Sequence, residues 1–198
     1  MRAVLVFWVL AGCTKSSSES LTLYPTTTLF SGADPAGGGM PDQVTIAASH
    51  ASHVTWGSTD ISVATVTGTA TLGTVSVLKE GNATITATTS SSHASLPLLV
   101  TAYAASDLAA GTTAFATYDC AKSGCHDATG SDISPSGIAK HTDPQLAAAI
   151  TTGYNSEGGE VSIGAAAHSF PIAAGTPEYV GIVAYLRALP PGTPVPDL

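Results

Sequence analysis

An alternation of apolar and polar residues dominates the middle of this 198-residue chain. Val44, Ile46 and Ala48, for example, fall on one side of an extended segment. A period of two residues is typical of a half-buried β-strand. The same alternation recurs at Val54 and Trp56, at Val75 and Val77, at Ala83, Ile85 and Ala87, and at Leu98, Val100 and Ala102.

Glycines separate these segments and predict turns between strands, namely the cluster at 37–39, Gly57, and the pair Gly81-Asn82. Several short strands at this spacing predict an all-β sandwich of two packed antiparallel sheets over residues 21–103. Its histidines, His50, His53 and His93, lie in polar, Ser-rich stretches. We interpret them as surface side chains, with a metal site as the alternative.

Two stretches of this segment carry a family resemblance. Residues 54–66 read VTWGSTDISVATV and residues 81–87 read GNATITA. Together they resemble the bacterial Ig-like domain of group 2. The resemblance implies an Ig-like sandwich with Trp56 and Val66 in its core. It also implies a spacer or docking role, although a fold alone does not determine a function.

The first residues resemble an export signal. Arg2 precedes an apolar run at 3–12, which is too short to span a bilayer and fits the core of a signal peptide. The run ends in Leu-Ala-Gly before Cys13, which resembles the bacterial lipobox. The resemblance implies cleavage after residue 12, a lipid on Cys13 and a polar, Ser-rich tether over 13–20. An ordinary secretory signal is the alternative. We expect an exported, lipid-anchored protein of the cell envelope, at the outer membrane, the periplasmic face or the cell surface.

From residue 104 to 198 the sequence becomes alanine-rich and predicts helices. Ser106 or Asp107 can cap a helix that runs through Phe115 and Tyr118. Cys120 and Cys125 follow, separated by four residues, and His126 comes directly after the second cysteine. This order suits covalent haem attachment, since each thiol can add to one vinyl group and the adjacent imidazole can bind the iron. A disulfide between the two cysteines and a zinc site are the alternatives.

The whole of residues 104–198 resembles a class I c-type cytochrome, although that family usually has two residues between its cysteines. The similar positions are Gly111 and Phe115 in the first helix, Pro135, the helix of residues 141–150 that ends at Gly153, and the helix of residues 176–189. The resemblance implies an all-α cytochrome c-like domain with one covalent haem c on Cys120 and Cys125. It implies His126 as the proximal iron ligand and the Pro135 carbonyl as the acceptor for its ring N–H.

The sixth iron ligand is predicted to be a second histidine. Class I cytochromes mostly use a late methionine, but Met1 and Met40 both precede this segment. His168 stands before Ser-Phe-Pro, where the family usually has its methionine, so we predict His168 as the distal ligand. His141, whose other interpretation is a capping residue, and an open iron are the alternatives.

Charge further limits the function. The net charge of −8 argues against binding to nucleic acid. Residues 106–198 contain nine acidic residues against Lys122, Lys140 and Arg187, which favours a redox partner with a basic docking face. We therefore expect an electron carrier and not an enzyme. The alternative is an adhesion or structural lipoprotein with a disulfide-closed helical module, and a haem enzyme subunit ranks below both. The tail from Pro190 to Pro196 is proline-rich and extended.

Overall fold

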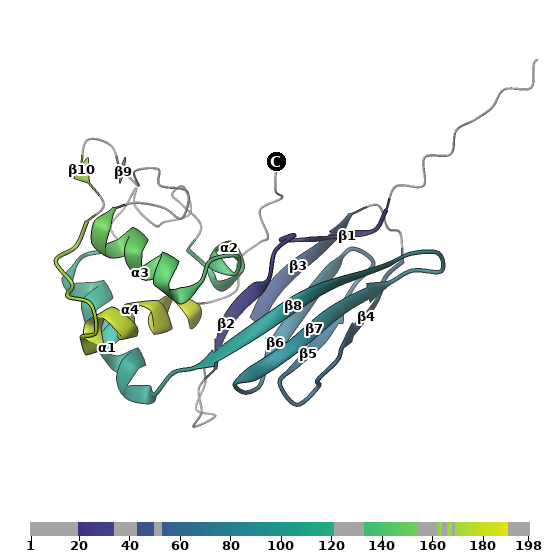
Figure 1. Ribbon diagram of the computed structural model, residues 1–198, viewed down its shortest axis with the longest axis horizontal. Helices are drawn as coiled ribbons and strands as arrows, with labels where there is room; N and C mark the ends of the chain where they lie inside the picture. The colour runs from purple at the N-terminus through teal and green to yellow at the C-terminus, as the bar shows by residue number, and fades with distance from the viewer. Residues whose placement is uncertain are drawn as a thin grey trace, which may run out of the picture.

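A computed structural model describes residues 20–33, 43–49, 53–120, 133–153, 162–163, 166–167 and 169–189. Within these ranges a β-sandwich is followed by a helical part that packs against one end of it (Figure 1). The predicted signal peptide, the tether up to residue 19, the glycine cluster at 37–39, Met40, His50 and the proline-rich tail lie outside the described residues. No helix in these ranges has the length and hydrophobicity to cross a membrane.

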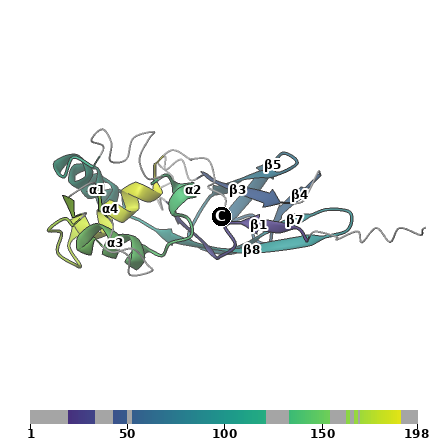
Figure 2. The same cartoon turned by 90° about the horizontal axis from the view of Figure 1, so that it is seen from above.

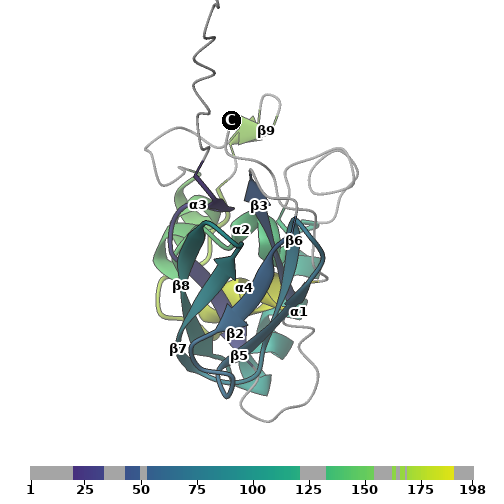
Figure 3. The ribbon, with the colours of Figure 1, turned by 90° about the vertical axis from the view of Figure 1, so that its right-hand side faces the viewer.

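The sandwich consists of two four-stranded sheets. One sheet has the order β1 (Thr22–Tyr24), β3 (Gln43–Ser49), β6 (Leu72–Val77) and β5 (Ala64–Gly68). The other has the order β2 (Leu29–Ala33), β8 (His93–Ala102), β7 (Gly81–Thr88) and β4 (Thr55–Ser58). Seen from the sandwich end, the sheets lie face to face with the helices behind them (Figure 3).

The predicted apolar stripes form the core between the sheets. Val44, Ile46, Val75 and Ile85 are fully buried, as a period-two pattern requires. Trp56 and Val66, expected in the core, are half-buried and pack against its edge. The Trp56 indole N–H donates to the carbonyl oxygen of Thr69 at 3.0 Å, which satisfies the one polar group of this ring.

Two details of the strands differ from the prediction. The pairing of β2 with β8 is parallel, because the chain crosses from β1 in one sheet to β2 in the other and enters it alongside β8. Gly57 lies inside β4 opposite Thr86 and not in a turn. A Cβ at Gly57 would stand 2.8 Å from the Thr86 hydroxyl, so this glycine serves close cross-strand packing. Gly81 and Asn82 open strand β7.

The helical part contains α1 (Ala105–Thr117), α2 (Pro135–Ile138), α3 (Asp143–Thr152) and α4 (Pro177–Arg187). A short antiparallel pair, β9 (Ser162–Ile163) and β10 (Ala166–Ala167), lies between α3 and α4. α4 begins at Thr176 as predicted, and the Thr176 hydroxyl accepts the Tyr179 N–H at 3.3 Å. α1 begins one residue before Ser106, because the N-cap is Ala104 and the Asp107 carboxylate accepts its N–H at 3.0 Å.

Helices α1 and α4 cross where two glycines meet. A Cβ at Gly181 would lie 2.5 Å from the Asp107 carbonyl oxygen and 2.6 Å from the Gly111 nitrogen. A Cβ at Gly111 would lie 2.8 Å from the Tyr185 Cβ. Only glycine permits backbones to approach this closely. The crossing creates a second hydrophobic core, separate from that of the sandwich.

The helical part sits at one end of the sandwich, so the described molecule is elongated (Figure 2). Tyr103, the first residue after β8, is buried and donates its N–H to the Ala33 carbonyl oxygen at 2.9 Å. Ala139, at the end of α2, is fully buried and belongs to the hydrophobic core of the sandwich. The two parts therefore share buried surface and are not joined by an extended linker.

Candidate functional site

The first predicted haem-binding cysteine lies directly beyond the end of α1. Tyr118 caps this helix, and Asp119 follows in the left-handed region with φ of 53°. Asp is one of the few residues that adopt this conformation readily. The turn brings the chain back, so that the Cys120 N–H donates to the Phe115 carbonyl oxygen at 3.1 Å. Cys120 is thereby held, half-buried, beside the first helix.

Apolar and aromatic residues form the core of the helical part behind this turn. The rings of Phe115 and Tyr185 lie 4.8 Å apart, and those of Tyr118 and Phe170 lie 5.3 Å apart. Both pairs are tilted, which is a favourable arrangement of aromatic rings. The buried members of the core are Ala114, Ile138, Leu146, Ala147, Ile150, Ile172, Ile182, Val183 and Leu186.

The short helix α2 follows the predicted attachment segment in the sequence. Pro135 is the first residue of this short helix and is fully buried. The Ser134 hydroxyl accepts the Gly137 N–H at 3.3 Å and caps the helix. Pro135, whose carbonyl is predicted to accept the ring N–H of the proximal histidine, is thus held at the start of a capped helix.

His141 occupies the turn between α2 and α3. Its N–H donates to the Ile138 carbonyl oxygen at 3.0 Å, and its ring is half-buried. The interpretation of His141 as a capping residue is wrong, because Thr142 caps α3. The Thr142 hydroxyl accepts the Gln145 N–H at 3.3 Å, and the Gln145 side chain accepts the Thr142 N–H at 2.8 Å.

Of the predicted site residues, the structure describes Cys120 and Pro135. Cys125, His126 and His168 lie outside the described residues, as does Cys13. Among the residues that are described, no group of three His, Cys, Asp or Glu side chains is arranged to hold a metal ion. His53 and His93 of the sandwich are exposed. His53 precedes β4, and His93 is the first residue of β8.

Two described residues, Cys120 and Pro135, belong to the predicted haem site. Covalent attachment of haem c uses two cysteine thiols, and cofactor sites are mostly apolar. Cys120 follows Tyr118, and Tyr118 packs against a core of buried aliphatic side chains together with other partly buried aromatic rings. The buried Pro135 has a carbonyl group and no N–H, so it can only accept a hydrogen bond.

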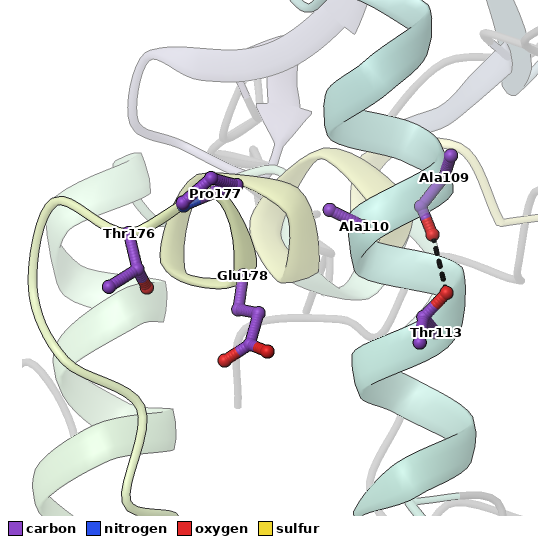
Figure 4. A pocket seen from close by; sticks show the side chains of 6 residues that line it. All are labelled: Ala109, Ala110, Thr113, Thr176, Pro177 and Glu178. Atoms are coloured by element: carbon purple, nitrogen blue, oxygen red, sulfur yellow. Dashed lines mark hydrogen bonds between the residues drawn. The ribbon is translucent and has the colours of Figure 1, made fainter.

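A shallow groove of about 610 Å³ lies beside the crossing of α1 and α4 (Figure 4). It is lined by Ala109, Ala110, Thr113, Thr176, Pro177 and Glu178. The Thr113 hydroxyl donates to the Ala109 carbonyl oxygen at 3.0 Å, and the Thr176 hydroxyl donates to that of Ala173 at 2.8 Å. Since both hydroxyls are used within their own segments, Glu178 is the remaining polar group, and the groove has no convergent donors for a ligand.

A buried polar cluster between the two parts of the molecule was not predicted from the sequence. Arg187, at the end of α4, is 0% exposed, and its Nη2 lies 3.0 Å from the Asp143 carboxylate. The Tyr103 hydroxyl donates to the other oxygen of that carboxylate. Burial, together with the negative charge of Asp143, raises the pKa of Tyr103 well above its usual range. The one available signal was an arginine between apolar residues late in an amphipathic helix.

Residues 35–100 match the family model of the bacterial Ig-like domain, group 2. The chain carries a bacterial Ig-like domain. The family model begins after β2, so strands β1 and β2 of this Ig-like sandwich lie outside the matched residues. A comparison with curated proteins gave no match.

Several solved structures resemble the Ig-like part. Domains 4 and 5 of the S-layer protein SbsC are 18% identical with a TM-score of 0.34, over 42% of this chain and 51% of that chain. Domains 1–6 of the same surface layer protein are 20% identical with a TM-score of 0.35, over 43% and 13%. A chimeric titin Z1Z2 is 14% identical with a TM-score of 0.27, over 43% and 96%. This chain thus spans about half of the first structure, and at these TM-scores the similarities carry no argument about function.

Proposed function

We propose that this protein is a single-haem electron carrier of the bacterial cell envelope, anchored by a lipid on Cys13. The observation that carries the proposal is the position of Cys120. It is half-buried beyond the end of α1, bonded to the backbone of Phe115, which packs against an aliphatic core, and it is the first residue of the Cys-x4-Cys-His segment. The crossing of α1 and α4 at Gly111 and Gly181 supports it, since the first and last helices of the class I cytochromes cross beside the haem.

Each residue of the site has a role in this proposal. Cys120 and Cys125 bind the haem through thioether bonds, and His126 is the proximal ligand. The Pro135 carbonyl accepts the ring N–H of His126 and fixes its tautomer. His168 is the distal ligand. When bound, the haem supplies the one-electron chemistry, and the protein supplies ligation, burial and orientation.

Two histidine ligands have a consequence for the reduction potential. A thioether ligand raises the potential of a haem relative to a second imidazole. We therefore expect His168→Met to raise the potential of the haem, and redox titration measures this. His141→Met is the matched control and leaves the potential unchanged when His168 is the ligand. The opposite result would assign the distal position to His141.

The helical part suits a basic redox partner. Arg187 is fully buried and paired, so it adds no positive charge to the surface. Among the described residues of the helical part, Lys140 is the exposed cation, and Asp119 and Glu178 are exposed acids. Electron transfer to a basic partner should slow as ionic strength rises, because salt screens charge steering. A rate independent of salt would argue against such a partner.

The first experiment is the visible spectrum of the full chain made in cells that attach haem c. We expect a c-type spectrum that survives acidic solvent extraction, and its loss in Cys120→Ala and Cys125→Ala. Cys13→Ala is the control, because it removes the lipid and leaves the haem. A colourless wild-type protein would contradict the proposal.

The Ig-like domain favours a second candidate function. The Ig-like domain at residues 35–100 also suits a structural or adhesive protein of the cell envelope. In that case Cys120 and Cys125 form a disulfide that closes the segment between α1 and α2. Thiol titration of the colourless protein before and after reduction would then yield two additional thiols only after reduction.

A further inference from the structure

The helical part completes an open edge of the Ig-like sandwich. β2 is an edge strand, so one side of its backbone has no partner within its sheet. The Phe30 N–H donates to the Ala139 carbonyl oxygen at 2.7 Å. The Phe30 carbonyl oxygen accepts Nη1 of Arg187 at 2.9 Å. In the other sheet, the Thr45 N–H donates to the Ser136 hydroxyl at 2.9 Å. α2 and the residue after it therefore fasten both sheets.

Arg187 is the centre of this contact. Its Nη1 also donates to the Ile138 carbonyl oxygen at 3.2 Å, and its Nη2 donates to that of His141 at 2.6 Å. Nε and Nη2 both donate to Asp143 Oδ1, at 3.3 and 3.0 Å. One planar guanidinium thus binds β2, the end of α2, the turn after α2 and the start of α3. A lysine ammonium has three donors and cannot reproduce this fork.

The residues around Arg187 are shaped for close contact. A Cβ at Gly32 would lie 2.5 Å from Cε2 of Tyr103 and 3.1 Å from the Arg187 Cβ. Gly32 therefore lets the end of α4 lie directly on β2. The Asp143 side chain is 29% exposed while that of Arg187 is 0% exposed, so loss of Asp143 would leave a fully buried charge unpaired.

We propose that Arg187 is a positioning residue that locks α2 onto the Ig-like edge, and that the Ig-like domain is thereby a structural part of the haem site. This inference rests on the proposed function. α2 begins with Pro135, the proposed acceptor for the proximal histidine. Movement of α2 away from the sandwich would move that acceptor.

Hydrogen exchange of the full-length protein tests the locking. We expect Arg187→Lys and Asp143→Asn to speed exchange of the Phe30, Ile138 and His141 amides by about ten- to a hundredfold, the size expected for loss of charged hydrogen bonds. Lys79→Met is the matched control, since it removes an exposed positive charge of the sandwich and should change none of these rates. Unchanged rates at Phe30 and Ile138 would overturn the locking role.

The haem measurement separates the inference from the proposed function. In the haem-loaded protein, Arg187→Lys should shift the reduction potential, whereas Lys79→Met should not. A haem-loaded variant with an unchanged potential would overturn the link to the haem site while the proposed function stands. A colourless wild-type protein would refute the proposed function and this link with it, and the exchange rates would still decide whether Arg187 locks α2.

Discussion

At the scale of single residues, one buried hydroxyl among the described residues has no hydrogen-bond partner. Ser31 of β2 is 3% exposed, and its Oγ is the buried side-chain polar atom without a hydrogen-bond partner among the described residues. We predict that Ser31→Ala stabilises the protein by about 1 kcal/mol, because it removes an unsatisfied polar group. Urea denaturation measures the change. Ser136→Ala is the control and should cost about 1 kcal/mol, since the Thr45 N–H loses its acceptor. Equal destabilisation by both variants would refute this explanation.

A second residue-scale prediction concerns Tyr103. Its folded-state pKa is raised, chiefly by burial and next by Asp143, whereas the unfolded chain has the ordinary value of about 10. The stabilisation is thus complete below about pH 10 and is lost as pH rises toward the folded value. We expect the free energy of unfolding to fall as pH rises above about 10, and Tyr103→Phe to flatten this slope. An identical slope in the variant would assign the alkaline loss to other groups.

At the scale of elements, the crossing of α1 and α4 depends on glycine. We predict that Gly111→Ala destabilises the helical part by about 1–3 kcal/mol through overpacking against Gly181. The cost of overpacking outweighs the gain in helix propensity from glycine to alanine, which is about 1 kcal/mol. Thermal unfolding followed by circular dichroism measures it. The exposed Ala109, also on α1, provides the control, since Ala109→Gly should lose only the propensity. A more stable Gly111→Ala protein would show that the helices separate without cost.

Elements were predictable from sequence where their signals are local. The Thr176 cap, the Gly153 end of α3 and the inward stripe of β3 each depend on residues a few positions apart. The parallel pairing of β2 was missed, because it depends on which sheet the chain enters. The role of Arg187 was missed for the same reason, since its bond to Phe30 spans 157 positions. In the candidate site, the cysteine motif could be recognised locally, whereas the distal ligand remains a prediction.

At the scale of the whole molecule, the shared core predicts cooperative unfolding. Ala139 of the helical part lies in the sandwich core, and Arg187 joins β2 to three segments of the helical part. Trp56 fluorescence reports the sandwich, and helical circular dichroism reports the other part. We expect both signals to change at the same denaturant concentration. Two separate midpoints would show that the Ig-like domain and the helical part are independent units.

The locked edge of β2 also affects how the helical end can move. The described chain enters the sandwich at Thr22, which pairs with Ser49 at one end of β3, while Ser136 binds Thr45 toward the other end. The point of entry and the helical part are therefore at opposite ends of the sandwich, and the helical part is joined to it by buried contacts (Figure 1). If the molecule pivots at Thr22, the helical end moves along an arc around that residue. The orientation and the position of the helical surface then change together. A partner protein therefore encounters this surface in a limited set of orientations and not in every orientation at every position.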